Sequence, residues 1–403
     1  MEVVSENVLL ADKIAQLIAA TKGDHATWES TADPDDADMI VESSGWQIMR
    51  KDNTTVAAVA EQELEIVEMD TDKTWYNDYF FGKPHVTFVG KDKAMGALVI
   101  SVVKEDFGDD FHFRVRVLSQ AGRQHVLVSS DDVNVKNKDL NSKMARKVVN
   151  VALPALEKMA LKVADDEKFC KRLATHETSE LVTKYKFGLL YVKDGQTVEE
   201  DMFANDGYVI DHSPEYQEFC DWLGDTIELQ GWEAYRAGLD VRSGGTGTTS
   251  IYTQWRHFEV MWHVATMLPY FPTDVQQLQR KRHLGNDIVM VVFVEGSTPY
   301  VPTCVYSQFN HVLLIVQPVD KELTGGRTCY RMSMACKSDV GTFGPKLPRQ
   351  KYFERSQDLR NWLYARLING ERTAILNAAG FRMTRERTAQ LWLADVCNDF
   401  GIS

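Results

Sequence analysis

The sequence predicts an α/β protein in which a large α/β domain is preceded by a smaller α+β domain built on an antiparallel sheet. In the smaller region, apolar and polar residues alternate along short strands, as from Phe111 to Val117. Such alternation gives each strand one wet face and one packed face, which is typical of an antiparallel sheet. From Lys186 onward strands and helices alternate instead, and that rhythm favours an α/β sheet.

The spacing of apolar residues predicts the individual elements. The expected strands are 55–68, 85–90, 97–104, 111–118 and 124–129 in the first region, and 187–192, 247–253, 260–266, 288–294 and 311–316 in the second. The expected helices are 8–20, 213–223, 274–284, 354–370 and 383–399. A helical period also covers 139–175, with a break at Pro154.

Composition is that of an ordinary globular protein. Of the 403 residues, 44% are apolar and 26% are charged, which allows a large core and more than one domain. The formal net charge of −13 argues against nucleic acid or an anionic membrane surface as the main partner, since both attract basic proteins. The apolar runs are far shorter than a bilayer span, so we expect no transmembrane segment.

Cysteine usage and the N-terminus indicate the compartment. The six cysteines are scattered and form no CxxC pair, and none has zinc-ligand spacing to a histidine, so we expect no metal site. Scattered cysteines fit a reducing cytosol. The first residues lack the basic-then-apolar order of a signal peptide. We therefore expect a soluble, cytoplasmic protein.

The segment 276–289 concentrates polar chemistry at the end of one predicted helix. Arg280, Lys281 and Arg282 are followed by His283 and Asn286, and an apolar strand comes directly after them. Thr273 can cap this helix and Gly285 can end it in a left-handed conformation. Residues 282 and 286 are four apart and share a face if the last turn persists.

This segment is also open to a purely structural interpretation. Basic residues in a final helical turn complement the helix dipole without any ligand. Asn286 could then be a simple helix terminator, and spacing alone does not decide between the two readings.

Three other features have plain structural interpretations. The glycine-rich segment Arg242–Thr248 lacks the Gly-Lys-Ser/Thr ending of a phosphate-binding loop, so we read it as a flexible loop. His263 lies inside an apolar strand, where a lone histidine is usually a hydrogen-bonded core residue. Phe309 directly precedes a strand, and an aromatic residue there is more often core than contact surface.

A set of short segments, taken in order, resembles a known family. The segments are Lys186–Tyr191, Gly195–Glu200, Gly238–Asp240, Thr246–Thr248, His263–Thr266, Leu268–Tyr270, the basic segment 276–289 and Phe343–Pro345. In this order and spacing, the chain from about 185 to 400 resembles the Rap GTPase-activating proteins, and within them the signal-induced proliferation-associated branch. A weaker likeness at Tyr79–Lys83 resembles the N-terminal dimerisation domain of that family.

The resemblance implies an organisation and a partner. It divides the chain into an unassigned N-terminal segment at 1–70, a dimerisation-type α+β domain at 71–180 and a catalytic domain at 181–403. The catalytic domain should be G-domain-like, and two chains should pair through the first domain. The implied partner is a Rap-type small GTPase in its GTP form, which also brings Mg-GTP, so the chain needs no cofactor of its own. Recruitment to membranes would come from the partner or from regions outside this sequence.

The resemblance also implies a mechanism. Ras-type proteins orient the attacking water with their own glutamine, whereas Rap proteins lack it and the family supplies a carboxamide from outside, the Asn thumb. In this sequence the thumb is Asn286. The family does not use an arginine finger, so Arg282 and His283 are expected to hold the thumb helix and support catalysis.

Four further residues match positions that the family places at the GTPase contact, namely Lys281, His263, Phe309 and Arg387, with Arg385 as an alternative to Arg387. Two alternatives stay open. The chain could activate another small GTPase such as Rheb, or it could be a non-catalytic scaffold that binds GTP-loaded partners.

Overall fold

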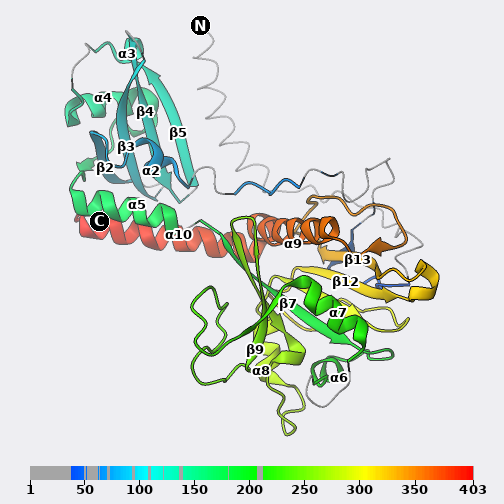
Figure 1. Cartoon of the computed structure of the whole chain (residues 1–403). Coiled ribbons are helices and arrows are strands. Elements are labelled where there is room, and N and C mark those ends of the chain that lie inside the picture. Colours follow the sequence, from blue (N-terminus) through cyan, green and yellow to red (C-terminus); the bar gives the residue numbers. More distant parts are fainter. Residues whose placement is uncertain are drawn as a thin grey trace. The chain divides into compact units, whose positions relative to one another are not determined.

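The structure is a computed structural model of the whole chain (Figure 1). It describes residues 38–49, 51, 62, 64–69, 73–92, 96–107, 110–120, 122–135, 139–179, 181–206 and 212–402. The predicted helix 8–20 therefore lies outside the described residues.

The larger sheet contains nine of the described strands. They are β1 (Trp46–Ile48), β7 (Lys184–Val192), β8 (Asp225–Glu228), β9 (Thr249–Trp255), β10 (Phe258–Val264), β11 (Val289–Val294), β12 (Val312–Val319), β13 (Cys329–Lys337) and β14 (Phe353–Glu354). The order is β1-β13-β12-β11-β7-β10-β9-β8, with β14 paired to β13. The central strands β12, β11, β7 and β10 are parallel, while the outer pairs are antiparallel.

Helices cover both faces of this sheet. Its helices are α6 (Glu199–Phe203), α7 (Pro214–Leu223), α8 (Leu278–Leu284) and α9 (Gln357–Asn377), with the short 3-10 turns η3 (Ala265–Met267) and η4 (Lys321–Thr324). Residues of α7 and α9 share one core with Phe187 and Leu189, whereas α6 and α8 share the other with Leu190 and Val192. Strand β7 is thus apolar on both faces, as a central parallel strand must be.

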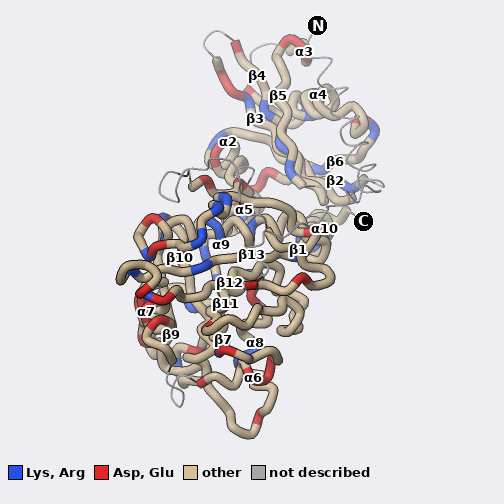
Figure 2. Tube along the Cα trace, turned by 90° about the vertical axis from the view of Figure 1, so that its right-hand side faces the viewer, with Lys and Arg blue, Asp and Glu red and all other residues tan. Residues whose placement is uncertain are grey.

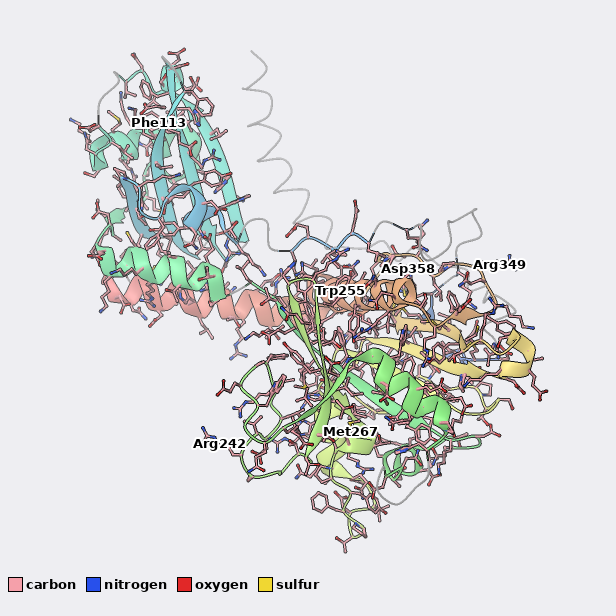
Figure 3. All side chains as sticks on the ribbon, viewed as in Figure 1. Phe113, Arg242, Trp255, Met267, Arg349 and Asp358 are labelled. Atoms are coloured by element: carbon pink, nitrogen blue, oxygen red, sulfur yellow. The ribbon has the colours of Figure 1, made fainter. Side chains whose placement is uncertain are left out.

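The second sheet is antiparallel, in the order β5-β4-β3-β2-β6. Its strands are β2 (His85–Asp92), β3 (Gly96–Phe107), β4 (Asp110–Ser119), β5 (Gly122–Ser129) and β6 (Leu161–Val163). The helices of this region are α2 (Trp75–Tyr79), α3 (Ser130–Val133), α4 (Ser142–Ala152), η2 (Pro154–Leu156) and α5 (Glu167–Ser179). Phe113 is fully buried in the core between the sheet and α4 (Figure 3).

The last helix, α10 (Ala379–Asp399), packs on the opposite face of this antiparallel sheet. Leu393 and Val396 join the same core as Phe169 and Leu173 of α5. The end of the chain therefore contributes to the core of the smaller sheet, although it follows the α/β region in sequence.

Both predicted fold classes are confirmed, and most predicted strands and helices are found within a few residues. The long strand β13 and the short strands β1, β6, β8 and β14 were missed. Within the predicted strand 55–68, the described residues 64–68 form no strand, and 55–61 lie outside the described part. The predicted helical stretch 139–175 contains four elements, namely α4, η2, β6 and α5. The predicted break at Pro154 is found, since η2 begins there, but the edge strand β6 before α5 was not predicted.

One buried ion pair organises the face of the smaller sheet that α2 and α5 cover. Arg116 of β4 and Glu177 of α5 are 1% and 0% exposed, with 2.8 Å between Arg116 Nη2 and Glu177 Oε1. The same carboxylate accepts the backbone N–H groups of Tyr76 and Asn77, at 3.0 and 2.9 Å, and so caps α2. Removing this carboxylate charge would leave a buried guanidinium uncompensated.

We predict that Glu177→Gln lowers the free energy of unfolding by about 3–5 kcal/mol, the usual cost of removing one partner of a buried ion pair. Urea unfolding measures the difference. The matched control is Lys171→Met, which removes an exposed pair with Glu167 on the same helix and should leave the unfolding midpoint unchanged. Equal effects of the two substitutions would contradict the assignment.

Candidate functional site

Helix α8 begins four residues later than predicted. Its N-cap is Gln277, in the left-handed region at φ +47°, and Thr273 does not cap it. Asp274 Oδ2 accepts the N–H of Leu278 at 2.8 Å instead. The Gln277 carboxamide bonds both the N–H and the carbonyl of Phe271, so the approach to the helix is a closed turn rather than a first helical turn.

The end of α8 also differs from its prediction. Gly285 has φ −69° and is right-handed, so the chain continues in the helical sense for one more residue. A Cβ at this position would lie 2.6 Å from the Lys281 carbonyl oxygen, which explains the glycine by space rather than by φ. The prediction that residues 282 and 286 share a helix face is confirmed, because Asn286 Nδ2 donates to the Arg282 carbonyl at 2.8 Å. The Asn286 side chain is exposed, and its Oδ1 accepts no hydrogen bond from the described residues.

A buried carboxylate lies directly under this turn. Asp287 is 0% exposed, and its oxygens contact His263 Nδ1 at 2.9 Å and Lys186 Nζ at 2.9 Å. His263 Nε2 lies 3.0 Å from the Ala237 carbonyl oxygen, and Lys186 Nζ also donates to the Asn286 carbonyl at 2.6 Å. The carboxylate thus joins β7, β10 and the turn after α8.

His263 is therefore a hydrogen-bonded core residue, as its apolar strand predicted. It is 1% exposed, so a partner could not reach it directly in this structure. Its part in the site is to orient Asp287, which sequence reasoning did not single out. The missed signal is the adjacency of Asp287 to Asn286, since a carboxylate at the start of a buried strand needs a partner.

His283 lies beside His263, with 5.0 Å between the ring centroids. The pKa of the His283 imidazole is lowered to about 4, mainly by burial; the neighbouring His263 and Arg282 contribute to the lowering, and Asp287 opposes it. The ring is thus neutral at neutral pH. It fills space under the last turn of α8 without adding a charge beside Arg282.

The three basic residues Arg280, Lys281 and Arg282 of α8 differ in their burial and in their partners. Arg280 is 0% exposed and donates to the carbonyls of Leu268 and Phe203, so it is structural. Lys281 Nζ lies 2.5 Å from Glu199 Oε2 on α6. Arg282 is exposed, and its guanidinium makes no hydrogen bond or ion pair within the part of the chain that is described.

Apolar side chains stand exposed around this end of the sheet. The exposed fractions are 43% for Phe271, 74% for Val275, 54% for Leu278, 74% for Tyr306 and 46% for Phe309. Three of them belong to the connection into α8 and its first turn, and two to the loop before β12. Phe309 is thus not a core residue, which corrects the reading from its sequence position. Exposed apolar groups on the segments that lead into α8 and into β12 make both segments candidates for an interaction surface.

Arg387 is exposed on α10. Within the described residues it forms no hydrogen bond or ion pair with α8 or with the loops beside it. The structure therefore brings together Asn286, His283, Arg282, Lys281 and His263, and it places Phe309 on the neighbouring loop, while Arg387 stands apart from this set of contacts.

The glycine-rich loop after β8 is organised by one carboxylate. The Ser243 hydroxyl and the N–H groups of Arg242 and Gly245 all donate to Asp240, and these bonds hold the pKa of that carboxyl well below its usual range. A Cβ on Gly247 would lie 2.3 Å from the Met267 carbonyl oxygen. Arg242 extends outward from this loop (Figure 3).

Basic and acidic residues are interspersed along the described trace, and α8 carries one of the basic segments (Figure 2). In the described ranges no helix is both long and apolar enough to cross a membrane. The same residues include no cluster of three or more histidine, cysteine, aspartate or glutamate side chains placed to hold a metal ion.

Comparison with known families gives two matches. Residues 202–390 match the family described as Rap/ran-GAP, and residues 72–185 match the Rap/Ran-GAP protein dimerization domain. A solved structure, that of the TSC2 GAP domain, covers 48% of this chain and 97% of its own, at 26% identity and a TM-score of 0.41.

Three relatives illustrate the likeness. Signal-induced proliferation-associated 1-like protein 3 of Mus musculus is 33% identical over 84% of this chain and 19% of its own length. The corresponding protein 2 of Homo sapiens is 34% identical over 83% and 20%. RapA guanosine triphosphatase-activating protein 1 of Dictyostelium discoideum is 31% identical over 93% and 40%. The chain thus spans a fifth to two fifths of the length of these relatives.

We predict that the His283 imidazole titrates with a midpoint near pH 4, because burial disfavours its charged form. The Cε1 proton resonance in NMR measures this midpoint. Between about pH 6.5 and pH 4 the unfolded chain takes up a proton that the folded site does not. This residue therefore makes folding stability fall as the pH falls through that window.

The control is His283→Gln, which removes this contribution and leaves that of other buried histidines. Its unfolding free energy should depend less on pH in the same window. An unchanged pH dependence, or a midpoint near 6.5, would show that the ring is not held in its neutral form.

Proposed function

Because this chain belongs to the Rap/Ran-GAP family, we propose that it stimulates GTP hydrolysis on a Rap-type small GTPase through the carboxamide of Asn286. The observation that carries the proposal is an exposed amide at the end of α8, fixed from below by the buried Asp287. Asn286 Nδ2 uses one donor on the Arg282 carbonyl, which leaves Oδ1 and one N–H for a ligand. An acceptor and a donor side by side suit a water molecule that must be held in line for attack.

Magnesium and GTP are then substrate groups that arrive with the partner. A small GTPase hydrolyses GTP slowly when the attacking water is poorly placed, and an activator that supplies the missing group lowers this barrier. In this proposal His283 and the network of Asp287, His263 and Lys186 hold Asn286 rigid. The apolar groups at Leu278 and Phe309 and the Arg282 guanidinium form the contact with the partner.

We expect Asn286→Ala to lower the catalysed hydrolysis rate on GTP-loaded Rap by about 10²- to 10³-fold, as for other groups that act in the transition state. Binding of the GTPase should be largely retained, since the alanine removes few contacts. Single-turnover phosphate release at varied protein concentration separates maximal rate from affinity.

The matched control is Arg282→Ala, which lies on the same helical face. It should weaken binding more than it slows the maximal rate, because its guanidinium is free to contact the partner. A near wild-type rate for Asn286→Ala would overturn the mechanism. Repeating phosphate release on a panel that includes Rheb separates Rap from other GTPases, and binding without faster release would indicate a scaffold.

The domain match at 72–185 supports a further part of the proposal, that two chains pair through the smaller sheet. We also propose that the protein acts in the cytoplasm and meets membranes through its partner. Sedimentation velocity should give a dimer mass at micromolar concentration. A monomer mass throughout that range would contradict pairing.

A further inference from the structure

Asn286 lies in the turn 284–287, and each backbone carbonyl of this turn accepts a hydrogen bond from a side chain of another segment. A helix normally leaves its last carbonyl groups without intrahelical partners. Here Asn310 Nδ2 donates to the carbonyls of Leu284 at 2.9 Å and of Asp287 at 2.7 Å. The Ser307 hydroxyl donates to the Gly285 carbonyl at 2.6 Å. Together with Lys186 on the Asn286 carbonyl, side chains from two other segments bond four consecutive carbonyls of 284–287.

Ser307 and Asn310 belong to one short loop that has hydrogen bonds of its own. The Ser307 Oγ accepts the N–H groups of Phe309 at 2.9 Å and Asn310 at 3.1 Å. Asn310 is 2% exposed, and β12 begins two residues after it. The loop is therefore attached to the sheet through β12. Its two donors to the turn, the Ser307 hydroxyl and Asn310 Nδ2, are held in place by the loop itself.

The same loop presents aromatic groups to solvent. Tyr306 and Phe309 are 74% and 46% exposed, and they lie one residue before and two residues after Ser307. A partner that contacts these rings would therefore also contact the loop whose Ser307 hydroxyl donates to the Gly285 carbonyl. The loop links the exposed apolar surface to the backbone directly beside Asn286.

We propose that Ser307 and Asn310 are positioning residues for Asn286. The inference rests on the proposed function and deepens it. With its backbone fixed on both sides, and its Nδ2 bonded to the Arg282 carbonyl, the carboxamide keeps one direction for Oδ1. Catalytic groups must be held within roughly 0.5 Å of their productive position, which an unbraced helix end does not provide.

The test measures maximal rate and affinity for GTP-loaded Rap in variants of the loop. Ser307→Ala should lower the maximal rate by about tenfold or more and leave affinity within about twofold. It disturbs the direction of the Asn286 carboxamide rather than the contact with the GTPase. Ser307→Thr restores a hydroxyl and should recover most of the rate. Asn310→Ala removes both donors without burying a charge, and should act like Ser307→Ala.

A double-mutant cycle separates positioning from a merely structural role. In the Asn286→Ala background, Ser307→Ala should cause no further loss of rate, because the group it positions is gone. The matched control is Thr324→Val, which removes a comparable buried bond from the Thr324 hydroxyl to the Arg327 carbonyl at 2.5 Å, on η4. It should lower the unfolding temperature without changing the maximal rate.

The outcomes are distinguishable. If Asn286→Ala is slow but Ser307→Ala has wild-type rate, the positioning inference alone is overturned. Equal losses from Ser307→Ala with and without Asn286 would also overturn it. If Asn286→Ala itself has wild-type rate, the proposed function fails, and this inference fails with it.

Discussion

The buried carboxylate of Asp287 is the interaction on which the site depends. A charge with no exposure must be paired, and this one is held by His263 on β10 and Lys186 on β7. There is room for it because residue 188 is glycine, where a Cβ would lie 3.2 Å from the Asp287 carboxylate oxygen. The segment Lys186–Gly188 thus supplies both the cation and the space, which gives a physical reason for that motif.

A second buried carboxylate lies near this network. Glu371 of α9 is 8% exposed, and its Oε2 has no partner among the described residues. The pKa of Glu371 is raised to about 8, mainly by burial; Lys186 opposes the rise and Asp287 contributes to it. A neutral Glu371 does not compete with Asp287 for the Lys186 ammonium group. That group therefore stays beside Asp287, where it also donates to the Asn286 carbonyl.

Periodicity predicted the central strands and the long helices because their burial is local in sequence. It missed β13, and it placed the start of α8 wrongly because the Gln277 side chain closes a turn with Phe271. The concentration of polar groups at 280–286 indicated the turn that is proposed here as the site. It could not predict Ser307 or Asn310, since these act on the turn from a loop that only folding brings beside it.

The placement of the turn bears on what it can do. Ligand sites of open α/β sheets lie outside the carboxyl ends of the strands, whereas Asn286 precedes the amino end of β11. Under the proposed function, the exposed Asn286 carboxamide therefore acts on the partner GTPase rather than on a ligand held in this chain. A neutral carboxamide is suited to this, because enclosing it on docking costs far less desolvation than enclosing a guanidinium. In the same proposal the exposed Arg282 stays at the wet rim of the contact, where its charge steers the encounter while the Asn286 amide is enclosed.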